Sequence, residues 1–296
     1  MTALMRRHGG LSFYVHKTNM LKFDRRSVVL CFVRSTIMLL LTLLPGLFGM
    51  FTSLAYGEGG AAGAANGVSV VKPADVYARF NTFNNLVRDC KIKPEPALKM
   101  MNMLLDEIGQ DYYRRGGRDY PRSDWVFPLE GHGVRSITGG RNKGYVASGY
   151  KYFSGNRHGG HPSFDIFIRD RNQDSLDDRI GRPVRVLSLG GGVVVALEKT
   201  WARGSRLRGG KYLWIYDPLN KLLVYYAHNS ELLVDLGTIV RPGDVLANVG
   251  RSGLNADKRR SPTHLHLTVI GMQSGSPKPV NVYSDLVRAR QVRADD

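Results

Sequence analysis

The sequence has little cysteine and a shortage of acidic residues, and both limit what the protein can be. Only two cysteines, Cys31 and Cys90, occur in 296 residues, so at most one internal disulfide is possible. Asp and Glu number 25 against 42 Lys and Arg, which gives a net charge of +17 at pH 7. A basic surface of this kind suits an anionic partner, such as nucleic acid, acidic lipid or an anionic cell-wall polymer.

Charged residues are also missing between Arg34 and Glu58, and four basic residues stand between positions 22 and 34. A basic start followed by an apolar stretch is typical of a secretory signal, and Ser53-Leu54-Ala55 fits a small-x-small cleavage site. A stretch of about 20 uncharged residues could also span a bilayer. We favour a cleaved signal within residues 1–55 over a membrane anchor through residues 36–56.

Either form of this segment would export the rest of the chain to the periplasm or cell envelope. We therefore expect no nucleic-acid partner. Cys31 lies in the export segment, so the exported part keeps one cysteine and no internal disulfide. We expect Cys90 to be a buried structural thiol rather than a nucleophile.

The exported part divides by composition. Residues 56–72 are rich in Gly and Ala and predict a flexible linker. Residues 73–123 form a helical region, with apolar residues at helical spacing and a stop at Gly116-Gly117. The Met and aromatic residues of this region are expected to be packing surface.

Residues 124–288 predict a β domain, and residues 289–296 a C-terminal tail. Short β-branched runs such as "KYLWIYD" and "KLLVYYAH" alternate with turn residues, and "DPLNK" predicts a hairpin. The triple glycine Gly190–Gly192 has no helix after it, so it is not a phosphate loop. The fold class is therefore mainly β, with an N-terminal helical region.

Histidines are concentrated in three short segments of this β domain. In "HLHLTVIG", strand alternation places His264 and His266 on one face, as two metal ligands or as a ligand beside a catalytic partner. In "HPSFD", four residues of straight strand would separate His161 from Asp165 by about 13 Å. Zinc donors each lie about 2 Å from the ion, so a shared ion requires a bend at Pro162-Ser163. His228 ends the strand "YYAH".

The motifs "HPSFD", "YAHNS" and "HLH", in this order, resemble the lysostaphin-type zinc endopeptidases of bacterial cell walls. The resemblance covers about residues 125–285 and implies a curved antiparallel sheet with a metal groove. It implies one zinc ion bound by His161, Asp165 and His266, with His228 and His264 as catalytic residues. No His-Glu-x-x-His motif is present, so a neutral histidine would take the proton. The sequence does not decide which one.

The expected function is therefore that of an exported zinc metallo-endopeptidase that hydrolyses peptide crosslinks of peptidoglycan through a metal-activated water. One alternative is a non-hydrolytic protein of the same fold that activates or binds cell-wall amidases. Another is a different zinc peptidoglycan hydrolase, a carboxypeptidase or an amidase. Residues 73–118 could cover the groove, position the substrate or bind a regulatory protein.

Three further segments have two interpretations each. His158 could be a ligand, but its spacing to Asp165 differs from the family's, and we favour a groove-lining role. "DRNQDSLDD" suggests a calcium loop, but Ser175 and Gly181 stand where an EF-hand needs Gly and an acid, so we favour a solvated acidic loop. "RGSRLRGGK" is either a solvated basic loop or part of the groove, where it would meet substrate carboxylates.

Overall fold

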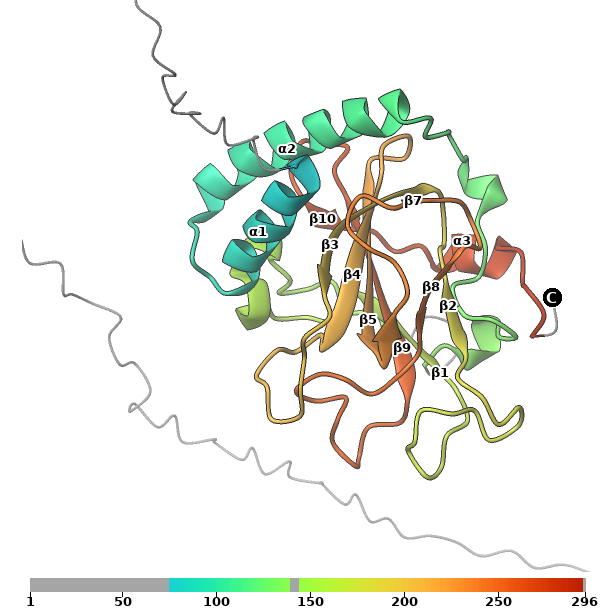
Figure 1. Cartoon of the computed structure of the whole chain (residues 1–296). Coiled ribbons are helices and arrows are strands. Elements are labelled where there is room, and N and C mark those ends of the chain that lie inside the picture. The colour runs from blue at the N-terminus through green and yellow to red at the C-terminus, as the bar shows by residue number, and fades with distance from the viewer. Residues whose placement is uncertain (1–74, 139–143, 295–296) are drawn as a thin grey trace, which may run out of the picture. The chain divides into compact units, whose positions relative to one another are not determined.

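The computed structural model describes residues 75–138 and 144–294, and these residues form two antiparallel β-sheets with helices packed against them (Figure 1). The strands are β1 (Ser163–Phe167), β2 (Arg185–Leu187), β3 (Gly192–Glu198), β4 (Lys211–Asp217), β5 (Leu222–Asn229), β6 (Glu231–Leu232), β7 (Ile239–Val240), β8 (Val245–Asn248), β9 (His264–Gly271) and β10 (Lys278–Pro279). The helices are α1 (Val76–Arg88), α2 (Pro94–Arg114) and α3 (Tyr283–Arg288), with short 3-10 turns η1 (Arg122–Asp124), η2 (Val134–Ser136) and η3 (Tyr152–Arg157). The predicted fold class, mainly β with an N-terminal helical region, is confirmed.

Helix α2 shows how the local sequence sets the helix bounds. Pro94 occupies its first turn, where the missing N–H would have no intrahelical partner. After its end at Arg114, Gly116 adopts a φ of 84°, and the Gly117 N–H donates to the carbonyl of Tyr112 at 2.8 Å. A left-handed glycine with this backward hydrogen bond is a common helix stop, and it lies where the Gly-Gly pair predicted one.

The larger sheet has the strand order β1-β9-β5-β4-β3-β7, with β10 paired to β9. The smaller sheet has the order β2-β8-β6. Strands β4 and β5 are joined by a hairpin between Asp217 and Leu222, as "DPLNK" predicted. The three strands β1, β9 and β5 lie side by side, and they carry the motifs that the sequence singled out.

Alternation along these strands gives the larger sheet two different faces. One face carries Phe164, Tyr226, Leu265 and Leu267, which are almost fully buried in a core shared with the smaller sheet and α3. The opposite face carries Asp165, His264 and His266 near one end and apolar side chains elsewhere. Since Leu265 is fully buried between the two histidines, the register of β9 is fixed by the core.

Helices α1 and α2 cover the apolar part of the second face (Figure 1). Phe80 and Met101 are fully buried and share one hydrophobic cluster with Trp214 and Leu223 of the sheet. Burial of this kind contributes roughly 2–3 kcal/mol for each large side chain. The helices therefore stabilise the sheet, and the cavity at the histidines stays open beside them.

Within residues 75–138 and 144–294, no helix has both the length and the apolar composition that crossing a bilayer needs. The predicted signal or anchor (1–55), the predicted linker (56–72) and the first two residues of the helical region lie outside the described residues. Cys90 is half-buried rather than buried, and its thiol donates to the Ser154 carbonyl at 3.3 Å.

The chain after α3 runs beside residues 125–131, and the backbone of Arg290 is hydrogen-bonded to the backbones of Trp125 and Phe127.

Candidate metal centre

Five side chains from three neighbouring strands and one preceding turn converge at the open end of the sheet. Asp165 of β1 and His266 of β9 are direct partners in the register, and Ala227 of β5 lies opposite His266 on the other side. Directly paired residues point to the same face. His264, two residues before His266, therefore points to this face too, as strand alternation predicted.

His161 reaches the same place because the chain turns at Pro162. The Ser163 N–H donates to the His161 carbonyl at 2.8 Å, which closes a tight turn around the proline before β1 begins. His161 itself is held by paired backbone hydrogen bonds with Val146. The bend brings His161 Nε2 to 3.3 Å from Asp165 Oδ2, so the bend expected at Pro162-Ser163 is present.

His228 joins the cluster through an unusual backbone conformation. In a regular strand, successive side chains face opposite ways, so His228 would point away from Ala227. Its φ is +68°, in the left-handed region that non-glycine residues seldom occupy. This turn places its ring 4.9 Å from His264 and 5.3 Å from His266, centroid to centroid. A positive φ is a strained conformation for a histidine, and strained backbone conformations are often found at functional sites.

Backbone carbonyls fix the orientation of three of the four imidazoles. Because a carbonyl can only accept, the Nδ1–H group is the donor in each case: His161 to Gly144 at 2.9 Å, His228 to Ser252 at 2.8 Å and His264 to Pro262 at 2.7 Å. In each of these three rings, the Nε2 atom therefore carries the free electron pair. His266 differs, since its Nδ1 lies 2.9 Å from Asp165 Oδ1. Hydrogen bonds from the second ring nitrogen to a backbone carbonyl, like those of His161, His228 and His264, commonly orient histidines that bind metals.

The charges around Asp165 keep it ionised. Burial raises the pKa of its carboxyl, but the neighbouring imidazoles of His161 and His266 outweigh burial and hold the pKa well below its ordinary value. The nearby carboxylate of Asp165 in turn raises the pKa of His161. Burial lowers the pKa of His264, and lowers that of His228 strongly, so both rings are neutral at pH 7.

Within the described part of the chain, two sets of three side chains present donor atoms that all lie within 4.8 Å of one another. One set is His161, Asp165 and His266, and the other is His228, His264 and His266. Nitrogen and carboxylate donors suit zinc, and three protein ligands leave a position for water at a catalytic site. The first set fits this pattern best, because it includes the carboxylate and because the His161 side chain is 38% exposed and so accessible from solvent.

His158 and Arg208 line the same cavity without joining either set. The His158 ring packs against Tyr150 at 4.8 Å, as a groove-lining role predicted. Arg208, from the basic loop "RGSRLRGGK", also lines the groove. Sequence reasoning missed the carbonyls of Gly144 and Ser252, and it missed Tyr225 on the cavity wall, because these contacts depend on how distant segments pack together.

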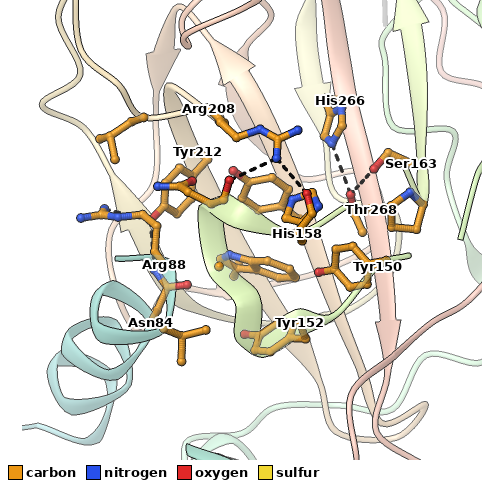
Figure 2. A pocket seen from close by; sticks show the side chains of 18 residues that line it. Asn84, Arg88, Tyr150, Tyr152, His158, Ser163, Arg208, Tyr212, His266 and Thr268 are labelled. Atoms are coloured by element: carbon orange, nitrogen blue, oxygen red, sulfur yellow. Dashed lines mark hydrogen bonds between the residues drawn. The ribbon is translucent and has the colours of Figure 1, made fainter. Parts of the chain in front are cut away.

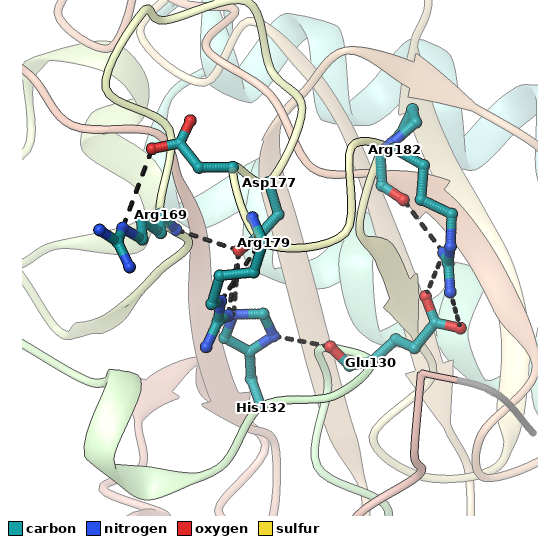
Figure 3. A network of polar contacts seen from close by, with 8 residues as sticks. Glu130, His132, Arg169, Asp177, Arg179 and Arg182 are labelled. Carbon is teal, nitrogen blue, oxygen red and sulfur yellow. Dashed lines mark hydrogen bonds and ion pairs between the residues drawn. The ribbon is translucent and has the colours of Figure 1, made fainter.

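The acidic segment 170–178 differs from the prediction of a solvated loop. Asp170 and Asp177 are 9% and 0% exposed. Asp177 accepts hydrogen bonds from Arg179 and from the backbone of Arg169, beside the buried His132 (Figure 3). The prediction is wrong for these two carboxylates, because the folded loop turns them inward to bind its own N–H groups.

The sheet, the groove and the His/Asp cluster together define a β-sheet protein with a candidate centre of the metal-hydrolase type. A family comparison agrees with the resemblance of the motifs: residues 174–281 match Peptidase family M23. This part of the chain is therefore similar to the lysostaphin-type peptidases. The matched region includes His228, His264 and His266, whereas His161 and Asp165 precede it.

Several solved structures are similar to the chain, and no curated protein matches it in sequence. A LytM protein from Ruminococcus gnavus is 25% identical, over 68% of this chain and 75% of that one, with a TM-score of 0.40. A zinc-containing peptidase from Vibrio cholerae is 22% identical, over 55% and 39%, with a TM-score of 0.33. The antimicrobial peptidase lysostaphin from Staphylococcus simulans is 19% identical, over 48% of each chain, with a TM-score of 0.32.

Proposed function

We propose that this chain is a zinc-dependent endopeptidase that hydrolyses peptide crosslinks of bacterial peptidoglycan in the periplasm or cell envelope. The observation that carries the proposal is the convergence of His161, Asp165 and His266 next to two further oriented histidines, in a chain with a peptidase family M23 domain. The export part of the proposal depends on the basic and apolar pattern before residue 56.

The proposed ligands are His161 through Nε2, Asp165 through its carboxylate and His266 through Nδ1. A zinc ion bound there would act as a Lewis acid, which lowers the pKa of a water molecule and polarises a peptide carbonyl. The hydrogen bond from His161 to Gly144 keeps the Nε2 electron pair directed toward Asp165. The ionised state of Asp165 suits a positively charged ligand.

His228 and His264 are proposed to handle protons and developing charge. Both rings are buried and neutral, and both have Nδ1–H bound to a carbonyl, so each presents a free Nε2. A neutral imidazole can accept a proton from water and return it to the leaving amine. The His264 Nε2 lies 3.8 Å from Asp165 Oδ1, so this ring is close to the proposed ligands without replacing them.

The test is product analysis on defined muropeptides. Purified protein should cleave crosslinked dimers at a peptide bond within the crosslink, as identified by mass spectrometry of the products. Chelator treatment should abolish cleavage, and one equivalent of zinc should restore it. Release of the stem peptide from the sugar would indicate an amidase, and release of a single terminal residue would indicate a carboxypeptidase. Pure protein without zinc and without cleavage would favour the non-hydrolytic activator.

A further inference from the structure

A second cavity (Figure 2) adjoins the cavity of the candidate metal centre, because the two share lining residues. The volumes are about 100 Å³ for the second cavity and about 270 Å³ for the first. Both are lined by His158, Arg208, Tyr225 and His266. A peptide whose reacting bond lies at the metal centre would therefore place a neighbouring residue in the second cavity, which we call the Arg208 cavity.

Helix α1 forms one wall of the Arg208 cavity through Asn84 and Arg88. Much of the remaining lining is aromatic, and the rings of Trp214 and Tyr225 lie 4.5 Å apart. The helical region, which the family match does not include, thus contributes directly to this cavity. An aliphatic chain can pack against such rings while a polar end group meets donors deeper in the site.

Arg208 carries a positive charge that has no partner within the described part of the chain. Its Nη1 donates to the carbonyls of Asn156 and His158, both at 3.2 Å, and no carboxylate of the described residues lies within ion-pair distance. Arg88, on the same cavity, differs because Asp89 and Glu198 neutralise it at 2.8 and 3.1 Å. The Nε and Nη2 groups of Arg208 make no hydrogen bond to any described residue and so remain available.

Three tyrosine hydroxyls on the cavity wall also have no hydrogen-bond partner among the described residues. They belong to Tyr150, Tyr152 and Tyr225, and burial raises the pKa of each, which keeps the hydroxyls protonated. Among the described residues, no aspartate or glutamate lines the Arg208 cavity. This lining offers several donors and the positive charge of Arg208, which an occupant with acceptors and negative charge would complement.

We propose that the Arg208 cavity is a specificity subsite for a substrate residue that ends in a carboxylate, next to the bond that is cleaved. The inference rests on the proposed function and adds the chemical class of the substrate. The guanidinium fork of Arg208 matches a carboxylate in geometry and charge. A neutral amide in the same place would leave the guanidinium without its charged partner.

The test compares three crosslinked stem-peptide dimers: one with all carboxyls free, one amidated only at the terminal carboxyl and one amidated only at the side-chain carboxyl. The wild-type chain should cleave the free dimer with a kcat/KM about 10- to 100-fold above that of one amidated form, the size of a charge-assisted contact in a partly buried site. The affected form identifies which carboxyl occupies the cavity.

The decisive variant is Arg208→Gln, and Arg206→Gln is its matched control. Arg206 lies on the same loop, is exposed and lines neither cavity. Arg208→Gln should lower kcat/KM for the free dimer to the level of the amide and leave the amide unchanged, whereas Arg206→Gln should keep the preference. A wild type that treats all three dimers alike would overturn the inference. So would an Arg208→Gln variant that loses activity equally on all of them, since that result indicates loop positioning alone.

Failure of the proposed function gives a different result. If the wild type cleaves no dimer, the peptidase assignment is wrong, and calorimetric binding of the same three dimers still tests the subsite. A Kd for the free dimer about tenfold or more below that of one amide, lost in Arg208→Gln, would support the subsite. Equal Kd values would contradict it.

Discussion

The buried carboxylate of Asp177 offers a stability prediction with a magnitude that follows from the structure. Asp177 is fully buried, accepts hydrogen bonds from the Arg179 side chain at 3.0 and 3.1 Å and lies 3.9 Å from His132 (Figure 3). Burial raises the pKa of Asp177, but the bonds from Arg179 outweigh burial and lower the pKa from 3.8 to about 2. A shift of that size corresponds to about 2 kcal/mol of folding stability.

The sign follows from the direction of the shift. Since the folded-state pKa is depressed, this stability is present above pH 3.8 and is lost as the pH falls through about 2. Asp177→Asn should therefore lower the free energy of unfolding by about 2 kcal/mol at pH 7. By pH 3, the difference in the free energy of unfolding between wild type and variant should have fallen to about half.

Urea unfolding of both proteins, followed by tryptophan fluorescence between pH 7 and pH 3, measures this gap. Asp178→Asn is the matched control, because its carboxylate is 28% exposed and accepts the Arg171 N–H only at 3.4 Å. The control should change stability by less than about 0.5 kcal/mol. The reasoning would be refuted if Asp177→Asn lowered the free energy of unfolding no more than Asp178→Asn does. It would also be refuted if the loss in Asp177→Asn stayed constant between pH 7 and pH 3.

Three further predictions concern the helices, the two catalytic candidates and export. Phe80→Ala should cost about 3–5 kcal/mol in urea unfolding of the whole chain, because Phe80 is fully buried against the sheet; a loss below about 1 kcal/mol would mean that the helices do not stabilise the β domain. His228→Ala and His264→Ala should each lower muropeptide turnover by roughly 10²-fold or more, and unchanged turnover in both would remove them from the mechanism. Material from the native host should begin near Tyr56 or keep an intact N-terminal anchor when sequenced, and a full-length chain free in the cytoplasm would contradict both forms of export.

Features that depend on local sequence could be predicted. Proline and glycine at the ends of α2 fix its bounds, because they act within one or two turns of the helix. The pair His264 and His266 shares a face because the alternation of a strand depends only on spacing. The bend at Pro162 followed from distance alone, since a straight chain could not bring His161 and Asp165 to one ion.

Features that depend on pairing between distant segments could not be predicted. The left-handed φ of His228 has no signal in its own sequence, and without it the ring would face the core. The free nitrogen of each ring depends on carbonyls such as those of Gly144 and Ser252, far along the chain. The acidic segment likewise appeared solvated because its spacing does not show that Asp177 turns inward.

The domain division at residues 123 and 124 remains a proposal. Helix α1 contributes Asn84 and Arg88 to the Arg208 cavity, which is otherwise formed by the β domain and the chain leading into it. Helix and sheet residues also share one hydrophobic cluster. The sequence offered covering the groove and positioning the substrate as roles of residues 73–118, but it could not single out Asn84 and Arg88, because no residue in this region carries a recognisable motif.

The most direct test of the central claim is the zinc content of five single-alanine variants and the wild type, measured on folded protein by mass spectrometry of the metal. The wild type should hold about one zinc per chain. Variants of the three proposed ligands, His161, Asp165 and His266, should hold almost none, because two protein ligands remain. Variants of His228 and His264 should keep about one. Loss of zinc from the His264 variant together with retention in the His161 variant would contradict the assignment and identify the second histidine set as the metal centre.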